Sequence, residues 1–212
     1  MLASQFHALN INEWKRKAHF HFFKQFEEPF FGVCIDIDCS KAVEFAKQEE
    51  TSFFLYYLYH SLKAANQCEP FRYRIVEKEQ VIVYDHINAS PTINREDGTF
   101  GFSVLPYRES FEQFVETALP IVEEVRNAEG LEPANDGSNM IHYSSLPWLK
   151  FTSLSHARSF SFPDSIPKIS FGKATEENGV WKMPVSIHAH HALMDGKDVA
   201  DYVDLFQSLM NS

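Results

Sequence analysis

MPVSIHAHHALMDGKDVADYVDLF (residues 183–206) joins a strand-like run to a helix-like run. Residues 183–191 alternate as a strand does, so His188 and His190 share one face and His191 points to the other. Residues 197–206 carry apolar side chains at helical spacing, which leaves 192–196 as the turn. Gly196 permits a sharp exit into the helix. The segment therefore places one histidine, apart from its two neighbours, at the end of a strand.

Working outward, the rest of the chain alternates between blocks of strands and blocks of helices. We expect strands at 30–38, two within 73–85, two within 90–107 around Asp97-Gly98, and a final pair around Asn178-Gly179. We expect helices at 41–50, 54–67, 110–128 and 197–212, with Pro120 kinking the third helix or starting a new segment. Residues 139–157 read as an extended stretch interrupted at Pro147. This order predicts an α+β fold with a mixed β-sheet flanked by helices. No linker or repeat divides residues 1–212, so we expect a single domain.

Composition excludes several classes of function. The formal net charge is −10, which gives no basic footprint for nucleic acid. The N-terminus lacks the pattern of a secretory signal, and the longest aromatic run is too short and polar to span a membrane. The three cysteines, Cys34, Cys39 and Cys68, form no C-x-x-C pair, which argues against a disulfide framework. We therefore expect a cytoplasmic protein without nucleic-acid or membrane partners.

The histidines allow three interpretations. His188-x-His190 is a spacing that zinc ligands use, but further ligands would have to come from His142, His156 or Asp195 by guesswork. The histidines could also be satisfied structural residues. The third interpretation is general-base catalysis of acyl transfer, because an imidazole that is neutral near pH 7 can take a proton from an alcohol as its oxygen attacks a thioester.

Three segments carry a resemblance to a known family. NEWKRKAHFHFF (12–23), SSLPWLKFTS (144–153) and MPVSIHAHHALMDG (183–196) resemble the chloramphenicol acetyltransferases, within the larger group of acyl-CoA-dependent acyltransferases that carry H-x-x-x-D-G. The resemblance implies the CoA-dependent acyltransferase fold, a two-layer sandwich. It implies acetyl-CoA as co-substrate, with no permanently bound cofactor and no metal. It also implies a homotrimer whose sites lie between subunits.

The resemblance assigns roles to individual residues. It makes His191 the general base and His190 structural, and it pairs Asp195 with Arg16 to orient the catalytic histidine. It points to Ser144 as the donor to the developing oxyanion, with Ser145 as a confusable neighbour. Ser170 falls where the family has a threonine lining the site, and Lys173 matches a basic residue near the cofactor. Asp195 could also be a plain helix N-cap.

Departures from the family concern the acceptor. Phe23 stands where the antibiotic-modifying members have tyrosine, and Ala174 replaces a tyrosine that stacks on adenine. His156 and Arg158 stand where apolar residues usually face the drug. An aromatic acceptor pocket could still be formed by five phenylalanines, Phe22, Phe23, Phe30, Phe100 and Phe102.

The sequence thus predicts an O-acetyltransferase that moves acetyl from acetyl-CoA to a hydroxyl of chloramphenicol or a similar small acceptor through a ternary complex. The alternatives are an acyltransferase for a different alcohol or a thiol, and a non-catalytic relative that binds a ligand without turnover.

Overall fold

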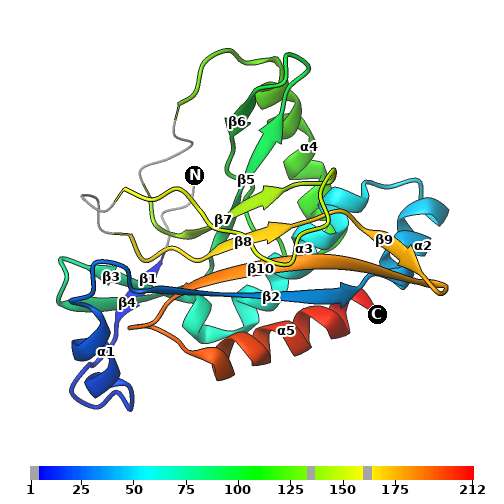
Figure 1. Ribbon diagram of the computed structural model, residues 1–212. Helices are drawn as coiled ribbons and strands as arrows, with labels where there is room; N and C mark the ends of the chain where they lie inside the picture. The colour runs from blue at the N-terminus through cyan, green and yellow to red at the C-terminus, as the bar shows by residue number, and fades with distance from the viewer. Residues whose placement is uncertain (1–4, 133–136, 160–163) are drawn as a thin grey trace.

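A seven-stranded mixed sheet forms the centre of the computed structural model, which describes residues 5–132, 137–159 and 164–212 (Figure 1). β7 pairs in parallel with β5 and β8, and the other pairs are antiparallel. Because β10 runs against β8, its last residue lies at the end of the sheet where β8 begins. The strands follow the order β2 (Phe30–Asp38), β10 (Val180–His190), β8 (Lys168–Phe171), β7 (Met140–Ser145), β5 (Asn88–Asn94) and β6 (Phe100–Phe102), and β9 (Thr175–Glu177) pairs with β10.

A small second sheet supports the N-terminal segment. It contains β1 (Phe6–Ala8), β4 (Gln80–Tyr84) and β3 (Tyr73–Val76), and β3 follows a short 3-10 helix, η1 (Glu69–Arg72). Helix α1 (Lys17–Phe23) packs here through Phe20, which is fully buried beside Tyr73 and Leu193. This cluster holds the N-terminal helix against the turn that follows β10.

Helices cover one face of the main sheet. α3 (Phe53–Gln67) and α5 (Gly196–Met210) lie against it, with α2 (Ser40–Gln48) and α4 (Phe111–Asn127) at their sides (Figure 1). The Ser61 hydroxyl of α3 joins the phenol of Tyr143 at 3.1 Å and that of Tyr202 at 2.6 Å, all three being buried. Since a buried hydroxyl without a partner is costly, this network fixes how α3 and α5 pack on β7.

The opposite face of the sheet is polar. Alternate residues point to it, so Ser144 and His142 of β7 lie there while Ser145 faces the helices and bonds the Tyr57 phenol at 3.0 Å. The described parts of 146–167 pass over this face, as the contact between Leu154 O and the His188 ring shows. The sheet therefore has an apolar face that carries the core and a polar face under a loop.

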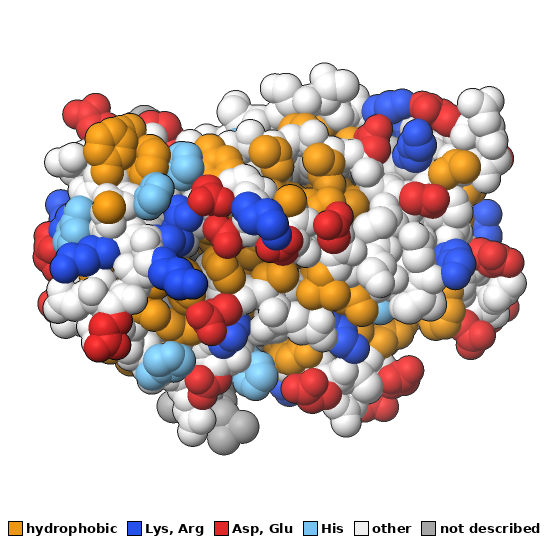
Figure 2. Space-filling model, turned by 90° about the horizontal axis from the view of Figure 1, so that it is seen from below, with side chains coloured by type: hydrophobic (Ala, Val, Ile, Leu, Met, Phe, Trp, Pro, Cys, Tyr) orange, Lys and Arg blue, Asp and Glu red, His pale blue; other side chains and the backbone are white. Residues whose placement is uncertain are grey.

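The α+β prediction with a mixed sheet and flanking helices is confirmed. Helix α4 continues through Pro120 as one element, so a second segment does not start there. Figure 2 views the α5 side, where acidic, basic and apolar side chains are interspersed. None of the helices in the described residues is both long and apolar enough to cross a bilayer.

Candidate active site

The turn after β10 is locked by Asp195. Its side chain accepts from Lys197 N at 3.0 Å, while Asp198 accepts from Asp195 N at 2.8 Å, which together form a capping box at the start of α5. The two preceding histidines diverge as alternation requires. His190 contacts Phe30 and His191 contacts Phe31, neighbours that point to opposite faces of β2.

The His191 ring lies between aromatic side chains. It stacks on Phe23 of α1 with centroids 4.0 Å apart and planes 8° from parallel, and Phe31 lies at 4.7 Å. Its Nδ1 is buried and has no hydrogen-bond partner among the described residues, while the residue as a whole is partly exposed. Packing thus fixes the plane of the ring and leaves Nε2 as the nitrogen that a substrate can reach.

Arg16 joins the N-terminal segment to this turn. One guanidinium nitrogen lies 2.6 Å from Asp195 Oδ2, and the other donates to the backbone carbonyl of His191 at 3.1 Å. The hydrogen bond from Arg16 lowers the pKa of the Asp195 carboxyl. The predicted pairing of Arg16 with Asp195 is therefore present, and the same carboxylate is also the helix N-cap.

His190 differs from its neighbour. Its Nδ1 accepts a hydrogen bond from Ala192 N at 3.2 Å, and burial, aided by the nearby Arg158, lowers its pKa to about 4. His190 is therefore buried and bonded within its own turn, and its structural role stays a prediction.

Ser144 and Ser170 lie side by side on the polar face. They are register partners in the parallel pair of β7 and β8, and Ser186 of β10 is the next residue in the same row. Ser145 is excluded from this row because its hydroxyl is turned to Tyr57. The structure thus brings together the expected oxyanion donor and the expected site-lining hydroxyl.

Within one chain, His191 and Ser144 do not meet. Ser144 lies two strands from Ser186, and His191 follows Ser186 by five residues along β10. At about 4.8 Å per strand and about 3.3 Å per residue, these steps separate the two residues by about 19 Å. Figure 1 shows the same arrangement, with β10 ending near α1 while β7 and β8 run away from it. A site that uses both residues needs a second chain.

Within one chain, the five phenylalanines that were expected to wall an acceptor pocket lie in separate groups. Phe22 and Phe23 pack with Phe26 beside His191. Phe30 lies on β2, whereas Phe100 and Phe102 lie on β6. These two strands form opposite edges of the sheet, so the strand order separates Phe30 from the other two rings. Phe102 pairs with Thr92 and so points to the face that carries Ser144.

His156 and Arg158 line a cavity of about 160 Å³ on the polar face. His156 Nε2 lies 3.5 Å from the Ser170 hydroxyl, and the Arg158 guanidinium lies 3.8 Å from the centre of the Phe30 ring. Two further residues line this cavity: Lys168, which sequence reasoning missed, and His188, which it considered only as a zinc ligand. A period of two would have found them, because each lies two residues before or after a serine of the polar row.

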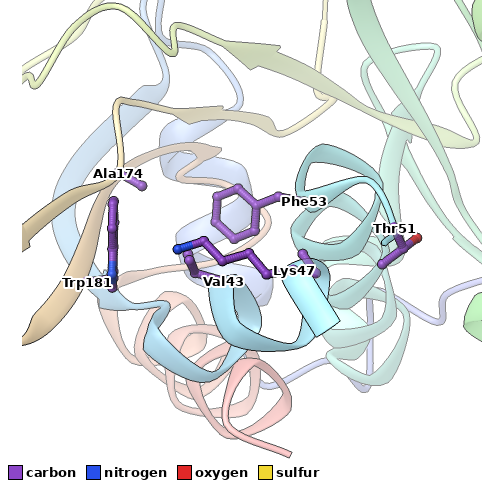
Figure 3. Close-up of a pocket in the computed structure, with 7 residues that line it drawn as sticks. Val43, Lys47, Thr51, Phe53, Ala174 and Trp181 are labelled. Carbon is purple, nitrogen blue, oxygen red and sulfur yellow. The ribbon is translucent and has the colours of Figure 1, made fainter. Parts of the chain in front are cut away.

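A second pocket of about 290 Å³ lies at the other end of β10 (Figure 3). Trp181 and Phe53 line it together with Ala174, and Lys47 extends between the two rings with its ammonium 5.5 Å from the centre of the Trp181 ring. Lys173 is exposed next to Ala174, and its backbone N bonds Leu149 O at 2.8 Å.

The zinc interpretation finds no further ligands. Among the residues that the structure describes, no group of three or more His, Cys, Asp or Glu side chains is placed to hold a metal ion. The His188 ring bonds the Leu154 carbonyl at 3.1 Å.

Comparisons with known proteins agree with this geometry. The fold is that of CoA-dependent acyltransferases, shared with a dihydrolipoamide acetyltransferase of Azotobacter vinelandii at a TM-score of 0.64 and 16% identity, over 92% of this chain and 86% of that one. A solved chloramphenicol acetyltransferase gives a TM-score of 0.91 at 30% identity, over 97% of this chain and all of that one. A curated chloramphenicol acetyltransferase 3 of Escherichia coli is 28% identical over 96% of both chains. The family model for chloramphenicol acetyltransferase matches residues 4–207, so the chain belongs to the chloramphenicol acetyltransferase family.

Proposed function

We propose that this protein transfers the acetyl group of acetyl-CoA to a hydroxyl of chloramphenicol or a similar small acceptor. The observation that carries the proposal is the held position of His191. Its ring stacks on Phe23, its carbonyl is bonded by Arg16, and the residue stays partly exposed although Nδ1 is buried. Membership of an acetyltransferase family supplies the reaction that such a base serves.

The reaction proceeds by direct transfer. His191 Nε2 takes the proton of the acceptor hydroxyl as that oxygen attacks the thioester carbon, and a C–O bond forms. The Ser144 hydroxyl donates to the carbonyl oxygen as it gains negative charge. The tetrahedral intermediate collapses, the C–S bond breaks, and the imidazolium returns its proton to the CoA sulfur. Free CoA and the acetyl ester are the products.

The site lies between two chains in this proposal. His191 of one subunit faces Ser144 and Ser170 of the next, which accounts for their separation within one chain. Large apolar side chains are exposed beside both halves, as expected of surfaces that meet in an assembly. Phe22 is 55% exposed and Phe26 42% near His191, while Trp148 is 68% and Leu149 56% exposed after β7. We propose a homotrimer, the closed ring that the family resemblance implies.

CoA is held near Lys173 in this proposal. The pocket of Figure 3 offers Trp181 and Phe53 as aromatic surfaces for adenine, in place of the tyrosine that Ala174 replaces. Lys47 and Lys173 supply cations for the phosphates of CoA. Because the chain has a net charge of −10, such a local pair of cations is needed to attract an anionic co-substrate. Trp181 lies five residues before Ser186 on β10, or about 16 Å along the strand from the row of Ser144, a distance that the extended pantetheine arm can span. Acetyl-CoA as a substrate, together with three cysteines that are free thiols, favours a cytoplasmic location.

The test is release of CoA thiol from acetyl-CoA in the presence of chloramphenicol and other alcohols. We expect turnover that falls about 100- to 10,000-fold in His191→Ala. The control is His190→Asn, which retains the proposed base and a polar side chain in the turn. Measured CoA binding without thiol release from any acceptor would instead indicate a non-catalytic binding protein.

A further inference from the structure

The cavity on the polar face has a floor of hydrogen-bonding side chains. His188 of β10 and Lys168 of β8 line it and are register partners, and His142 of β7 continues their row beyond the cavity lining. Gly32 of β2 continues the row, and a Cβ there would come within 2.8 Å of the His188 ring. The glycine therefore makes room for this imidazole at the floor of the cavity.

The walls of the cavity carry both donors and acceptors. Lys168 forms an ion pair with Asp164, and their side chains are only 11% and 23% exposed. Arg158 forms an ion pair with Glu28 at the mouth of the cavity. His156 completes the set, with its ring edge-on to His188 at 4.8 Å and its Nε2 beside Ser170.

The imidazoles offer hydrogen bonds without charge. Burial lowers the pKa of His156 and of His142 to about 4, and it also lowers the pKa of His188. A neutral imidazole has one donor and one acceptor nitrogen. Because His188 Nε2 meets the Leu154 carbonyl, Nε2 carries the hydrogen and Nδ1 remains an acceptor.

This chemistry matches hydroxyl groups better than it matches other ligands. A hydroxyl donates and accepts, so it can bond a neutral imidazole, an ammonium or a carboxylate. An anion would meet the carboxylate of Glu28 in the cavity, and the two cations there already pair with Glu28 and Asp164. A largely apolar acceptor would cover these polar groups without satisfying them, at a cost of about 1–3 kcal/mol for each unpaired group.

We propose that this cavity selects a small, neutral, polyhydroxylated alcohol as the acetyl acceptor, with Lys168 and His156 as residues that determine this specificity over chloramphenicol. The inference rests on the proposed acetyl transfer and names its substrate class. One hydroxyl of the acceptor is esterified, and the others bond the row of His188 and Lys168 and the wall at His156. The transfer step is unchanged: the acceptor O–H and the thioester C–S bond break, and an ester C–O bond and a CoA S–H bond form.

The experiment compares kcat/KM for thiol release across four kinds of probe in the complete oligomer. The probes are methyl glucoside and myo-inositol as polyols, a ribonucleoside, chloramphenicol, and glycerate as an anionic hydroxy acid. We expect the best polyhydroxylated neutral probe to exceed both chloramphenicol and glycerate by at least about 100-fold, because each buried polar group left unpaired costs about 1–3 kcal/mol. A preference for chloramphenicol or for glycerate would overturn the inference.

Two variants connect the preference to the cavity. His156→Phe and Lys168→Met should each lower kcat/KM for the polyol about 10- to 100-fold and raise the ratio of chloramphenicol to polyol turnover. Lys197→Met, which removes an exposed ion pair with Asp201 on α5, is the matched control and should leave the ratio unchanged. If Lys168→Met fails to fold, His156→Phe still tests the inference, because His156 is only half-buried. An unaltered ratio of chloramphenicol to polyol turnover in His156→Phe would contradict the inference.

The outcomes separate the inference from the function beneath it. Thiol release that depends on His191 but is faster with chloramphenicol than with the polyols supports the proposed acetyl transfer and contradicts the polyol specificity. Absence of thiol release with every probe, despite measured binding of CoA, rejects the proposed function itself.

Discussion

Arg16 and Asp195 lie 179 residues apart in the sequence and are joined by a contact of 2.6 Å between their charged groups. The same carboxylate begins helix α5, and the same guanidinium bonds the carbonyl of His191. One ion pair therefore connects the N-terminal segment, the turn that carries His191 and the last helix. The role of Asp195 as helix cap and its role in orienting His191 are compatible because its two oxygens serve different partners.

Asp195→Asn separates these two roles. Asparagine caps helices about as well as aspartate, so we expect the free energy of unfolding to change by less than about 1 kcal/mol. The loss of the charge weakens the hold of Arg16 on the turn, and kcat should fall about 100-fold because a small misplacement of the base is costly. Steady-state kinetics and urea unfolding measure the two effects. Asp195→Ala should also lose the cap, about 0.5–2 kcal/mol; equal kcat in Asp195→Asn and the parent protein would contradict the orienting role.

The adjacent serines provide a matched pair of substitutions. Ser144→Ala should lower kcat about 100- to 1,000-fold because it removes the proposed oxyanion donor. Ser145→Ala should leave kcat unchanged. It should lower the free energy of unfolding by about 1 kcal/mol, because it removes only the hydrogen bond to Tyr57. Steady-state assays of thiol release measure kcat for both variants, and urea unfolding measures their stability. A larger fall in kcat for Ser145→Ala than for Ser144→Ala would contradict the assignment of Ser144 as the oxyanion donor.

The elements of the fold could be predicted from local patterns, but their positions across the sheet could not. The alternation in 183–191 correctly separated His190 from His191, and the motif pointed to the pairing of Arg16 with Asp195. β1 escaped prediction because three exposed residues carry no periodic signal. Phe30 and Phe100 lie at opposite edges of the sheet within one chain because strand order is set by long-range pairing, which local spacing does not encode.

The polar floor was also missed for a physical reason. Lys168 and His142 read as isolated polar residues within short strands, and only the register places them beside His188. Their joint burial depends on the loop that crosses the face, whose path has no sequence periodicity.

Stability should depend on pH through buried histidines. Burial lowers the pKa of His60, His156 and His190 to about 4, against an ordinary value near 6.5. Between these values the unfolded chain binds more protons, so the free energy of unfolding falls as the pH falls from about 6.5 toward 4. The slope from these three histidines is at most about 4 kcal/mol per pH unit, and His142, whose pKa is also lowered to about 4, adds to it in the same direction.

Urea unfolding at pH 7.0 and 5.5 measures this slope. His60 is a buried histidine of α3, away from the proposed active site. His60→Phe removes one of the three imidazoles and should reduce the number of protons taken up on unfolding by about one. Stability that rises as the pH falls through this window would contradict the assignment of these imidazoles as neutral.

Trp181→Ala tests the pocket of Figure 3 as the place of the CoA adenine. Loss of an aromatic surface under a base typically costs about 1–3 kcal/mol, so KM for acetyl-CoA should rise about 5- to 150-fold. KM for the acceptor should not change, because the acceptor cavity lies toward the other end of β10. An unaltered KM for acetyl-CoA in a folded Trp181→Ala protein would place the adenine elsewhere.

The most direct test of the central claim, that His191 and Ser144 of different chains form one site, is complementation between two inactive variants. His191→Ala and Ser144→Ala are denatured together in equal amounts and refolded, so that subunits mix. If each site takes its histidine from one chain and its serine from the next, about a quarter of the sites regain both residues, and about a quarter of the parent activity returns. Activity that stays at the level of the separate variants, in oligomers shown to be mixed, would contradict the account.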